Sequence, residues 1–579
     1  MIQRAKLQID ELVRAAYSRA SEKGTLPAGA ELGGTVEIPK DTVFGDYACS
    51  YAMSAARLMR MSPKKIAEAL KAETDLSGSY FADVSVAGAG FINFTLSDKW
   101  YADVIHDIES MGPDYGACDV GKGRRVMVEF VSANPTGPMH MGNARGGVLG
   151  DSLASVLSRA GFEVWREFYV NDSGNQIEKF AQSINSRYLQ LIHGEDGYPF
   201  PENGYHGDDI RELAKDFLEL NGREAESWPE SERLIAMTKF GLGINIPKMK
   251  SDLERYMISY DEWFYESELH AGGYVDETVD ILTGLGCTYE RDGALWLCTS
   301  KLLRTKYSAE GKSGDQIEKL DLKDDVLRRA NGLCTYFAAD IAYHRDKLEK
   351  RGFDVAVNIW GADHHGHVAR LQAALDALGL DGSNRLVVVL MQLVNLMRDG
   401  ETVRMSKRTG KSIALSDLLD EISVDAARYF FNSRSSDSHL DFDLGLAVRE
   451  DSENPVYYVQ YAHARICSLI AALNEEGYDV PSARDTDISV LSDPEERELI
   501  KQLSLLPEEI RLASRDWDPS RINRYTVELA ARFHRFYNAC RIKGEEDKLL
   551  LARLKLADTV RLVIKNCLEL IGVSAPNKM

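Results

Sequence analysis

One stretch of the chain limits its possible folds more than any other. Residues 124–133 (RRVMVEFVSA) form a nearly continuous apolar run, which is typical of a strand buried on both faces of a parallel sheet. The loop NPTGPMHMGN (134–143) follows, then a predicted helix to about Ala160, and GFEVWREFYVN (161–171) has the pattern of a second strand. Strand, turn, helix and strand make a βαβ unit. We therefore predict an α/β fold with a Rossmann-like, doubly wound core.

The whole chain of 579 residues, which includes this unit, divides into four predicted segments. An amphipathic helix over 1–20 and a hairpin over 84–96 predict an N-terminal α+β domain at 1–115. The α/β domain spans 116–420, because strand-like patterns return at 354–365 and 385–397, and the more polar, helical residues 172–280 resemble an insertion within it. A linking segment at 421–453 is followed by 454–579, where helical periodicity alone predicts an all-α domain.

The average charge of the chain conceals an uneven distribution. Its 69 Lys and Arg and 90 Asp and Glu give a net charge of −21, which argues against a protein that coats nucleic acid. Residues 511–565, however, hold 13 Lys and Arg against seven Asp and Glu, with Phe533, Phe536 and Tyr537 among them. Such side chains can stack on unpaired RNA bases, although helix-spaced aromatic residues are more often core.

The sequence also indicates a cellular compartment. No apolar run reaches the roughly 18–20 residues that a transmembrane helix needs, and the N-terminal residues lack the pattern of a signal peptide. The eight cysteines are scattered, which favours reduced, buried thiols over a disulfide framework. We therefore expect a cytoplasmic protein with no membrane partner.

Two loops have the composition of phosphate-binding elements. In the loop 134–143, Gly142 allows close backbone approach, the following helix presents its N-terminus, and His140 can donate to a phosphate oxygen. A lone histidine is more often structural, so the second loop, RMSKRTGKS (404–412), adds weight. Its Lys407 could neutralise the charge that builds on a leaving pyrophosphate.

Together these loops resemble the HIGH and KMSKS signatures of class I aminoacyl-tRNA synthetases, with HMGN at 140–143 and RMSKR at 404–408. Longer strings narrow the resemblance to arginyl-tRNA synthetases, and it covers nearly the whole chain. These strings are SANPTGPMHMGNARGGVLGD (132–151), WGADHHGHVARLQ (360–372), RMSKRTGKSI (404–413) and NPVYYVQYAHARI (454–466). Two positions depart from the signatures: Asn143 replaces the last His of HIGH, and Arg404 replaces the first Lys of KMSKS.

The resemblance implies a ligase that attaches L-arginine to tRNA(Arg) in two steps, using ATP with Mg²⁺, with no structural metal, and working as a monomer. It implies an N-terminal module that meets the tRNA elbow, a linking segment that contacts the stem, and a C-terminal anticodon-binding bundle. The site residues that it implies are His140, Asn143 and Lys407 for catalysis; Pro135, Gly137, His140, Gly142, Asn143, His365, Met405, Ser406 and Lys407 for ATP; Glu129, Ser132, Asn134, Tyr336, Asp340 and His364 for arginine; and Tyr537 and Met579 for tRNA.

Two carboxylates fit the arginine pocket on physical grounds as well. A guanidinium needs planar, bidentate acceptors, and Glu129 lies on the buried strand, where a charge is costly unless it is paired. Asp340 stands one helical turn from Tyr336, so both side chains would face the same way. A structural ion pair of Glu129 with a protein arginine is the competing interpretation.

Three other readings remain open from the sequence alone. The chain could be another nucleotidyl-transferring enzyme of the HIGH superfamily, such as one resembling pantetheine-phosphate adenylyltransferase, although those chains are much shorter. It could also be a catalytically dead tRNA-binding protein. His364, His365 and His367 beside Asp363 suggest zinc, but their spacing does not suit a strand or helix.

Overall fold

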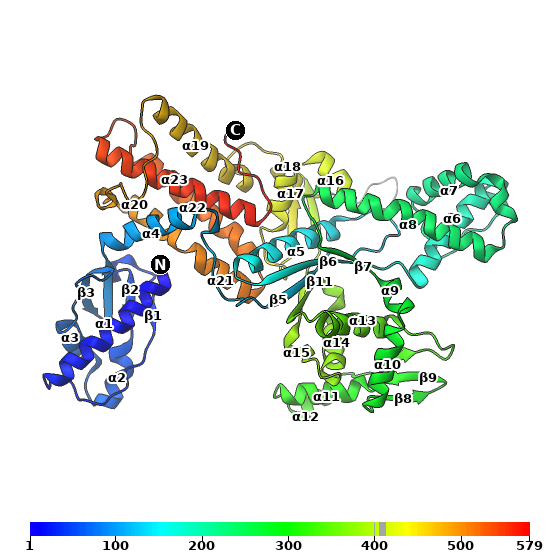
Figure 1. Ribbon diagram of the computed structural model, residues 1–579, viewed down its shortest axis with the longest axis horizontal. Coiled ribbons are helices and arrows are strands. Elements are labelled where there is room, and N and C mark those ends of the chain that lie inside the picture. The colour runs from blue at the N-terminus through cyan, green and yellow to red at the C-terminus, as the bar shows by residue number, and fades with distance from the viewer. Residues whose placement is uncertain (399, 404–412) are drawn as a thin grey trace.

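The computed structural model describes residues 1–398, 400–403 and 413–579. At its centre lies a sheet of five parallel strands in the order β12-β11-β5-β6-β7 (Figure 1). The strands are β5 (Arg125–Glu129), β6 (Glu163–Val170), β7 (Glu262–Tyr265), β11 (Val355–Gly361) and β12 (Leu386–Met391). Helix α5 (Met141–Arg159) connects β5 to β6, so the predicted βαβ unit and the Rossmann-like core are confirmed.

The central strand β5 is shorter than the predicted run 124–133, because the backbone turns away at once after Glu129. Val131 and Ser132 adopt φ angles of +68° and +40°, in the left-handed region that side chains with a Cβ avoid. Helix α5 packs closely behind this turn, since a Cβ on Gly150 would lie 2.2 Å from the ring of Phe130. This close packing of α5 fixes where the turn ends and the helix begins.

The predicted insertion 172–280 is not a single unit, because it contains the core strand β7. The chain instead leaves the sheet twice. Between β6 and β7 it forms an arm of three helices with its own apolar core, namely α6 (Asn175–His193), α7 (Asp208–Asn221) and α8 (Glu230–Arg255). Figure 1 shows this arm reaching away from the sheet.

The second departure lies between β7 and β11 and builds a subdomain below the sheet in Figure 1. Its strands β8 (Thr288–Arg291), β9 (Ala294–Leu297) and β10 (Asp325–Arg328) form a small antiparallel sheet. Its helices are α9 (Glu266–Ala271), α10 (Tyr274–Gly284), α11 (Thr299–Ala309), α12 (Gly314–Glu318) and α13 (Tyr336–Arg345). Helix α13 continues into a π-helical turn, Asp346–Lys350, and α14 (His365–Ala377) and α15 (Gly382–Arg385) lead to β12.

The run 385–397 is also divided between two sheets. Its first half is β12 of the central sheet, and its second half is β13 (Val394–Arg398), which pairs with β14 (Glu401–Thr402) and β15 (Leu440–Asp443). Helices α16 (Leu415–Glu421), α17 (Val424–Phe431) and α18 (Leu444–Ala447) surround this smaller sheet. The C-terminal helices are α19 (Pro455–Glu475), α20 (Pro494–Ser504), α21 (Leu506–Asp516), α22 (Ser520–Ala539) and α23 (Asp547–Leu570).

The N-terminal elements form a four-stranded antiparallel sheet in the order β1-β2-β4-β3, covered by helices. The strands are β1 (Val36–Glu37), β2 (Tyr47–Cys49), β3 (Phe81–Ala87) and β4 (Phe91–Leu96), and the helices are α1 (Ile2–Glu22), α2 (Tyr51–Met59), α3 (Pro63–Ala72) and α4 (Asp98–Met111). The hairpin predicted at 84–96 is confirmed as β3–β4. Ion pairs Asp98–Arg497 and Glu109–Lys555 join α4 to the C-terminal helices.

All eight cysteines are free thiols. Burial was expected for all of them, but only Cys49, Cys540 and Cys567 are buried, and the other five are half-buried. Within the described ranges, no helix is long and apolar enough to cross a membrane.

A fully buried guanidinium, that of Arg428 on α17, joins three parts of the chain. It lies 2.5 Å from the carboxylate of Asp151 on α5 and donates to the carbonyls of Tyr256, at the end of α8, and Ile571, just past α23. A Cβ at position 572, where Gly572 has a φ of +64°, would lie 2.2 Å from this guanidinium. Arg428, within the predicted linking segment 421–453, therefore fastens the core to the C-terminal helices.

We expect Arg428→Met to destabilise this junction by about 3–5 kcal/mol, because Asp151 loses its buried partner. A chain of several domains does not unfold in one step, so the thermal midpoint should be read together with hydrogen exchange of α17 and α23. The exposed Arg434→Met in the following loop is the control, with an effect within about 0.5 kcal/mol. Equal effects of the two substitutions would contradict the role given to Arg428.

Candidate active site

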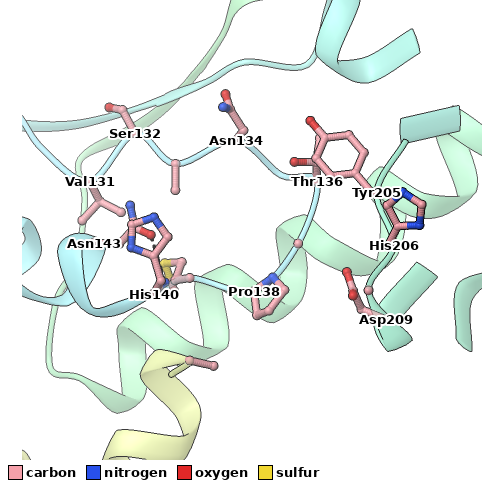
Figure 2. Close-up of a pocket in the computed structure, with 15 residues that line it drawn as sticks. Val131, Ser132, Asn134, Thr136, Pro138, His140, Asn143, Tyr205, His206 and Asp209 are labelled. Atoms are coloured by element: carbon pink, nitrogen blue, oxygen red, sulfur yellow. Dashed lines mark hydrogen bonds between the residues drawn. The ribbon is translucent and has the colours of Figure 1, made fainter. Parts of the chain in front are cut away.

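A cavity of about 700 Å³ opens where β5 ends. The turn from Val131 to His140, together with Asn143 of α5, forms one wall. Residues 205–207 and Asp209, which precede and begin α7 in the helical arm, form the facing wall, and Ala414 closes one side. Figure 2 shows Tyr205 and His206 across the cavity from His140 and Asn143. The cavity thus lies at the carboxyl end of a parallel strand, where open α/β sheets bind ligands.

His140 is the N-cap of α5, and its hydrogen bonds indicate which ring nitrogen carries the proton. Its Nδ1 accepts from the backbone N–H of Gly142 at 3.1 Å, while the Oδ1 of Asn143 accepts from the N–H of His140 at 3.0 Å. Desolvation lowers the pKa of His140, which favours the neutral ring. With Nδ1 accepting, the neutral ring carries its proton on Nε2, which has no hydrogen-bond partner among the residues that the structure describes.

The reciprocal cap also explains Asn143, one of the two departures from the expected signature. Its short amide side chain reaches back to the N–H of His140 and satisfies a donor at the helix start. The small size of Gly142 suits the same arrangement, since a Cβ there would approach the His140 ring at 3.1 Å. Gly142 therefore shapes the cap and does not itself line the cavity.

The predicted clamp residues Met405, Ser406 and Lys407, with Arg404, lie outside the described residues. The segment that follows them is anchored beside the cavity, because the N–H of Leu415 donates to the carbonyl of Met139 at 2.8 Å. Ala414 forms an isolated antiparallel bridge with His140 and lines the cavity with it. Backbone contacts thus link the first predicted phosphate-binding loop to Ala414 and Leu415, which follow the second loop in the sequence.

Asn134 and Gly137 line the cavity, as the ATP and arginine assignments require, but two other predicted residues are elsewhere. Pro135 is buried, and its carbonyl accepts from the side chain of Asn245 on α8. His365 is exposed at the start of α14 and does not line the cavity.

The carboxylate of Glu129 is fully engaged with protein groups on one of its oxygens. Oε2 accepts from Nζ of Lys347 at 2.5 Å and from Nδ2 of Asn358 at 3.2 Å, while Oε1 accepts from Oγ of Ser132 at 2.9 Å. The sequence allowed a structural ion pair with an arginine. The structure shows an ion pair, but with a buried lysine.

Asp340 lies in the same part of the core, on α13. Its carboxylate accepts from Nε2 of His367 at 2.5 Å and lies 3.0 Å from Nδ1 of His344. Burial alone would raise the pKa of Asp340, but the two histidines outweigh it and hold the pKa well below its usual range. Tyr336, one turn earlier, is 44% exposed, and its hydroxyl accepts from the N–H of Asn175 at the start of α6.

Two residues near these carboxylates were not predicted. Glu266 is buried at the end of β7, and burial raises its pKa. Desolvation raises the pKa of Tyr169 on β6, and the charges of Glu266, Asp340 and Glu129 raise it further, so three carboxylates converge on this phenol. Glu266 follows the apolar strand WFY directly, and this pattern matches Glu129 on its own strand. The same signal could therefore have found Glu266.

His364 was predicted for the arginine pocket, but its side chain is exposed on the 3₁₀ turn before α14. His367, one turn further on, is the histidine that contacts Asp340. The reason is geometric: His367 lies on the inward face of α14, beside Phe337 and Trp360. Among the residues that the structure describes, no group of three His, Cys, Asp or Glu could hold a metal ion.

The aromatic residues of the C-terminal helices form a stacked surface on α19 and α22. The rings of Tyr457 and Tyr461 stack at 6.1 Å, His534 stacks on Tyr461, and the guanidinium of Arg465 lies 4.1 Å from the centre of the Tyr537 ring. Phe533 and Phe536, in contrast, are fully buried core residues. Met579 is 52% exposed at the end of the chain.

The basic stretch 511–565 is less positive in the structure than its composition suggests. Twelve of its 13 Lys and Arg side chains form ion pairs, for example Arg521 with Asp516 and Arg532 with Glu528. The local excess of positive charge is therefore largely neutralised by nearby acids, which the sequence count did not show.

Comparison with known proteins covers almost the whole chain. Residues 7–96 match the arginyl tRNA synthetase N terminal domain, 110–443 match tRNA synthetases class I (R), catalytic domain, and 459–579 match the DALR anticodon binding domain. Proteins named arginine–tRNA ligase from Acetivibrio thermocellus and Caldanaerobacter subterraneus are each 50% identical over 579 residues, which is 100% of both chains in each case.

Solved structures agree with these matches. A putative arginyl-tRNA synthetase from Campylobacter jejuni has a TM-score of 0.73 at 35% identity, covering 84% of this chain and 100% of that one. The arginyl-tRNA synthetase of Thermus thermophilus has a TM-score of 0.72 at 20% identity over 99% of this chain and 100% of that one, which supports the fold alone.

Two substitutions separate the effect of Asn143 on stability, through the helix cap, from its effect on a ligand in the cavity. We expect Asn143→Ala to destabilise the free protein by about 1 kcal/mol, because the N–H of His140 loses its acceptor. Asn143→Asp keeps an acceptor and should retain most of this stability, while its negative charge should raise the KM for ATP. Thermal denaturation and ATP-dependent kinetics check both effects. An aspartate variant as unstable as the alanine variant would contradict the capping role.

Proposed function

The chain belongs to the arginyl-tRNA synthetase family of class I aminoacyl-tRNA synthetases and ligates arginine to tRNA, and from that premise we propose which residues carry out the reaction. The proposal rests on one observation above all: His140, whose Nδ1 accepts from the N–H of Gly142, lines a cavity at the end of β5, beside a group of buried carboxylates. We propose that the cavity holds ATP and that the carboxylates hold arginine.

ATP enters as its Mg²⁺ complex, and the turn from Asn134 to His140 lies along it. His140 donates from Nε2 to a phosphate oxygen, and the positive end of α5 favours the same anionic group. Asn143 supports this contact through the cap. Lys407, with Met405 and Ser406, reaches the pyrophosphate from the loop whose end is anchored at Ala414.

Arginine lies with its guanidinium between Asp340 and Glu266, near the hydroxyl of Tyr336. Two carboxylates in a partly dry site suit a planar cation that presents several donors. Ser132 and Asn134 meet the α-amino end, next to the phosphates. Glu129 completes this part of the pocket with its single open acceptor. An amino acid without a guanidinium would leave these buried acceptors unpaired, which gives high selectivity without an editing site.

The reaction needs no nucleophile from the protein. The carboxylate of arginine attacks the α-phosphate of ATP in line, an O–P bond forms, and pyrophosphate leaves with the electrons of the broken bond. A ribose hydroxyl of the terminal tRNA adenosine, which we take to be the 2′-OH, then attacks the arginyl carbonyl and AMP leaves. Positioning and stabilisation of charge by His140 and Lys407 supply the catalysis.

We assign the anticodon to the stacked surface on α19 and α22, with Tyr537 and Met579 as contacts, because aromatic rings that are at least partly exposed can stack on unpaired bases. Residues 1–115 would meet the tRNA elbow, 421–453 would contact its stem, and the α/β domain at 116–420 would hold its 3′ end. We further propose that the enzyme works as a cytoplasmic monomer. Analytical ultracentrifugation tests the last point.

ATP–pyrophosphate exchange with each amino acid, with and without tRNA, tests the whole assignment. We expect exchange with arginine alone, and the family resemblance implies that it requires tRNA. Exchange with a different amino acid would contradict the pocket proposed here. A protein that binds tRNA without any exchange would indicate that the catalytic site is not used.

We expect Asp340→Asn to raise the KM for arginine by about 10–100-fold, because the guanidinium loses a charged acceptor, while the KM for ATP changes little. The matched control is Asp363→Asn on the neighbouring exposed turn, which should leave both constants unchanged. Exchange kinetics over a range of arginine concentrations measure the effect. An unchanged KM for arginine would remove Asp340 from the pocket.

We expect Lys407→Ala to lower kcat of arginine activation by about 100–1,000-fold with a smaller change in the KM for arginine, because the lysine stabilises the leaving pyrophosphate. Lys323→Ala, an exposed lysine paired with Asp321, is the control. Turnover at the parental rate would show that Lys407 does not act in this step.

A further inference from the structure

Lys347 is a fully buried lysine near the proposed arginine site. Its Nζ lies 2.5 Å from Oε2 of Glu129, 3.3 Å from Oδ1 of Asn358, and 4.1 Å from the centre of the Tyr343 ring. A lysine without solvent contact is rare and costly, and it persists only where its charge is paired and its donors are used.

Lys347 lies on the π-helical turn that extends α13, and this turn places it next to Glu129. Asp340, His344 and Lys347 recur at intervals of four and three residues along α13 and its extension, so they share one face. The extension Asp346–Lys350 is π-helical, a form that is often found at functional sites. That face points toward the carboxyl end of β5, where Glu129 is the last strand residue.

Counting acceptors shows what Glu129 has left to offer. A carboxylate has about four lone-pair positions, two on each oxygen. On Oε2 both are taken, by Lys347 and by Asn358, and on Oε1 one is taken by Ser132. One acceptor position remains, on Oε1. Glu129 therefore cannot bind a guanidinium with both oxygens, and its charge is already balanced by Lys347.

The hydrogen bond between Glu129 and Ser132 also supports the strained turn at which the cavity begins. Oγ of Ser132 donates to Oε1 of Glu129 and accepts from the N–H of Tyr169 at 3.2 Å. Val131 and Ser132 both have left-handed φ angles, a strained conformation for residues with a Cβ, which persists only where the surroundings support it. Asn134 and His140 follow on this turn, so the ion pair lies directly behind residues proposed to bind substrate.

We propose that Lys347 is a positioning residue for arginine activation: it closes one oxygen of Glu129 and directs the other to Ser132 and to a single donor of the substrate. This proposal deepens the proposed function and rests on its assignment of arginine to this pocket. Asp340 and Glu266 then offer the guanidinium its bidentate partners. Glu129 contributes one acceptor, next to Ser132, in place of the two-oxygen grip on the guanidinium that the sequence suggested.

The other charged and titratable groups around the pair are accounted for by partners of their own. Nε2 of His344 accepts from Asn358, so its proton lies on Nδ1 and faces Asp340. Beyond Tyr343, Glu167 is held by Arg351 in two hydrogen bonds and also accepts from the Tyr343 hydroxyl. The pKa values of the nearby phenols Tyr169 and Tyr260 are raised by burial first and then by carboxylates including Glu129. Lys347 is thus the cation bonded directly to Glu129.

Three variants of the full-length enzyme test the proposal in arginine-dependent pyrophosphate exchange with tRNA present. Lys347→Met keeps the length of the side chain and removes its charge, Lys347→Arg keeps the charge, and Lys555→Met removes another buried lysine, which pairs with Glu109 far from the cavity. Thermal denaturation and circular dichroism determine the folded fraction of each, so that rates refer to folded enzyme.

We expect Lys347→Met to lower kcat/KM for arginine at least 10-fold with the KM for ATP within twofold of the parent. The loss should be larger at pH 6.5 than at pH 8.5, because a buried carboxylate without its cation takes up a proton instead. The parent should not show this pH dependence. Lys347→Arg should recover part of the activity, and Lys555→Met should change stability alone.

A Lys347→Met enzyme with the parental pH profile and no loss beyond its folded fraction would overturn the proposal and leave Lys347 a purely structural residue. A lower KM for arginine would overturn it too, since Lys347 would then compete with the substrate for Glu129. The Asp340→Asn variant separates a failure of the pocket assignment from a failure of the role given to Lys347. If it leaves the KM for arginine unchanged, the pocket assignment fails; if it raises the KM while Lys347→Met behaves as the parent, only the role of Lys347 fails.

Discussion

The rest of the structure depends on one buried guanidinium. Arg428 takes the carboxylate of Asp151 from the helix that follows the central strand, a carbonyl from the end of the helical arm, and a carbonyl from just past the last long helix. A charge in this position is tolerated only if all its donors are used, so the three parts cannot move apart without exposing it. The proposed substrate cavity and the C-terminal helices, which carry the proposed anticodon surface, are thereby joined through one buried group.

Buried charges recur around the catalytic sheet in the same paired form. Glu129 is matched by Lys347, and Glu167 on the next strand is matched by Arg351, so neither pair leaves a net charge beneath the pocket. Asp340 and Glu266 differ, because histidines are their neighbours instead of lysine or arginine. A cationic substrate therefore meets its strongest attraction at these two carboxylates. The division follows from desolvation: only a carboxylate without a permanent counter-ion gains much by binding a cation.

The sequence predicted the parts of this site that depend on order along the chain. The apolar run of β5, the turn between β5 and α5, and the one-turn spacing of Tyr336 and Asp340 all follow from local pattern, and the structure contains each of them. Pairing across the fold was not predictable. Lys347 lies 218 residues from Glu129, and the strand β7 lay hidden in a segment of helical composition. His364 was chosen over His367 because a motif gives position along the chain but not which face of α14 turns inward.

The net charge of −21 has a different consequence in three dimensions than along the chain. Most Lys and Arg side chains of the basic stretch 511–565 form ion pairs with neighbouring acids, so the stretch does not present a broad positive surface to phosphates. This distribution of charge favours the proposed anticodon contacts, which work at short range, over a large contribution from counterion release. In that proposal the contacts come from the stacked rings of Tyr457, Tyr461 and His534, with Arg465 over Tyr537. An acidic enzyme can in this way select one RNA by shape and stacking while it repels others, because stacking requires bases that are already unpaired.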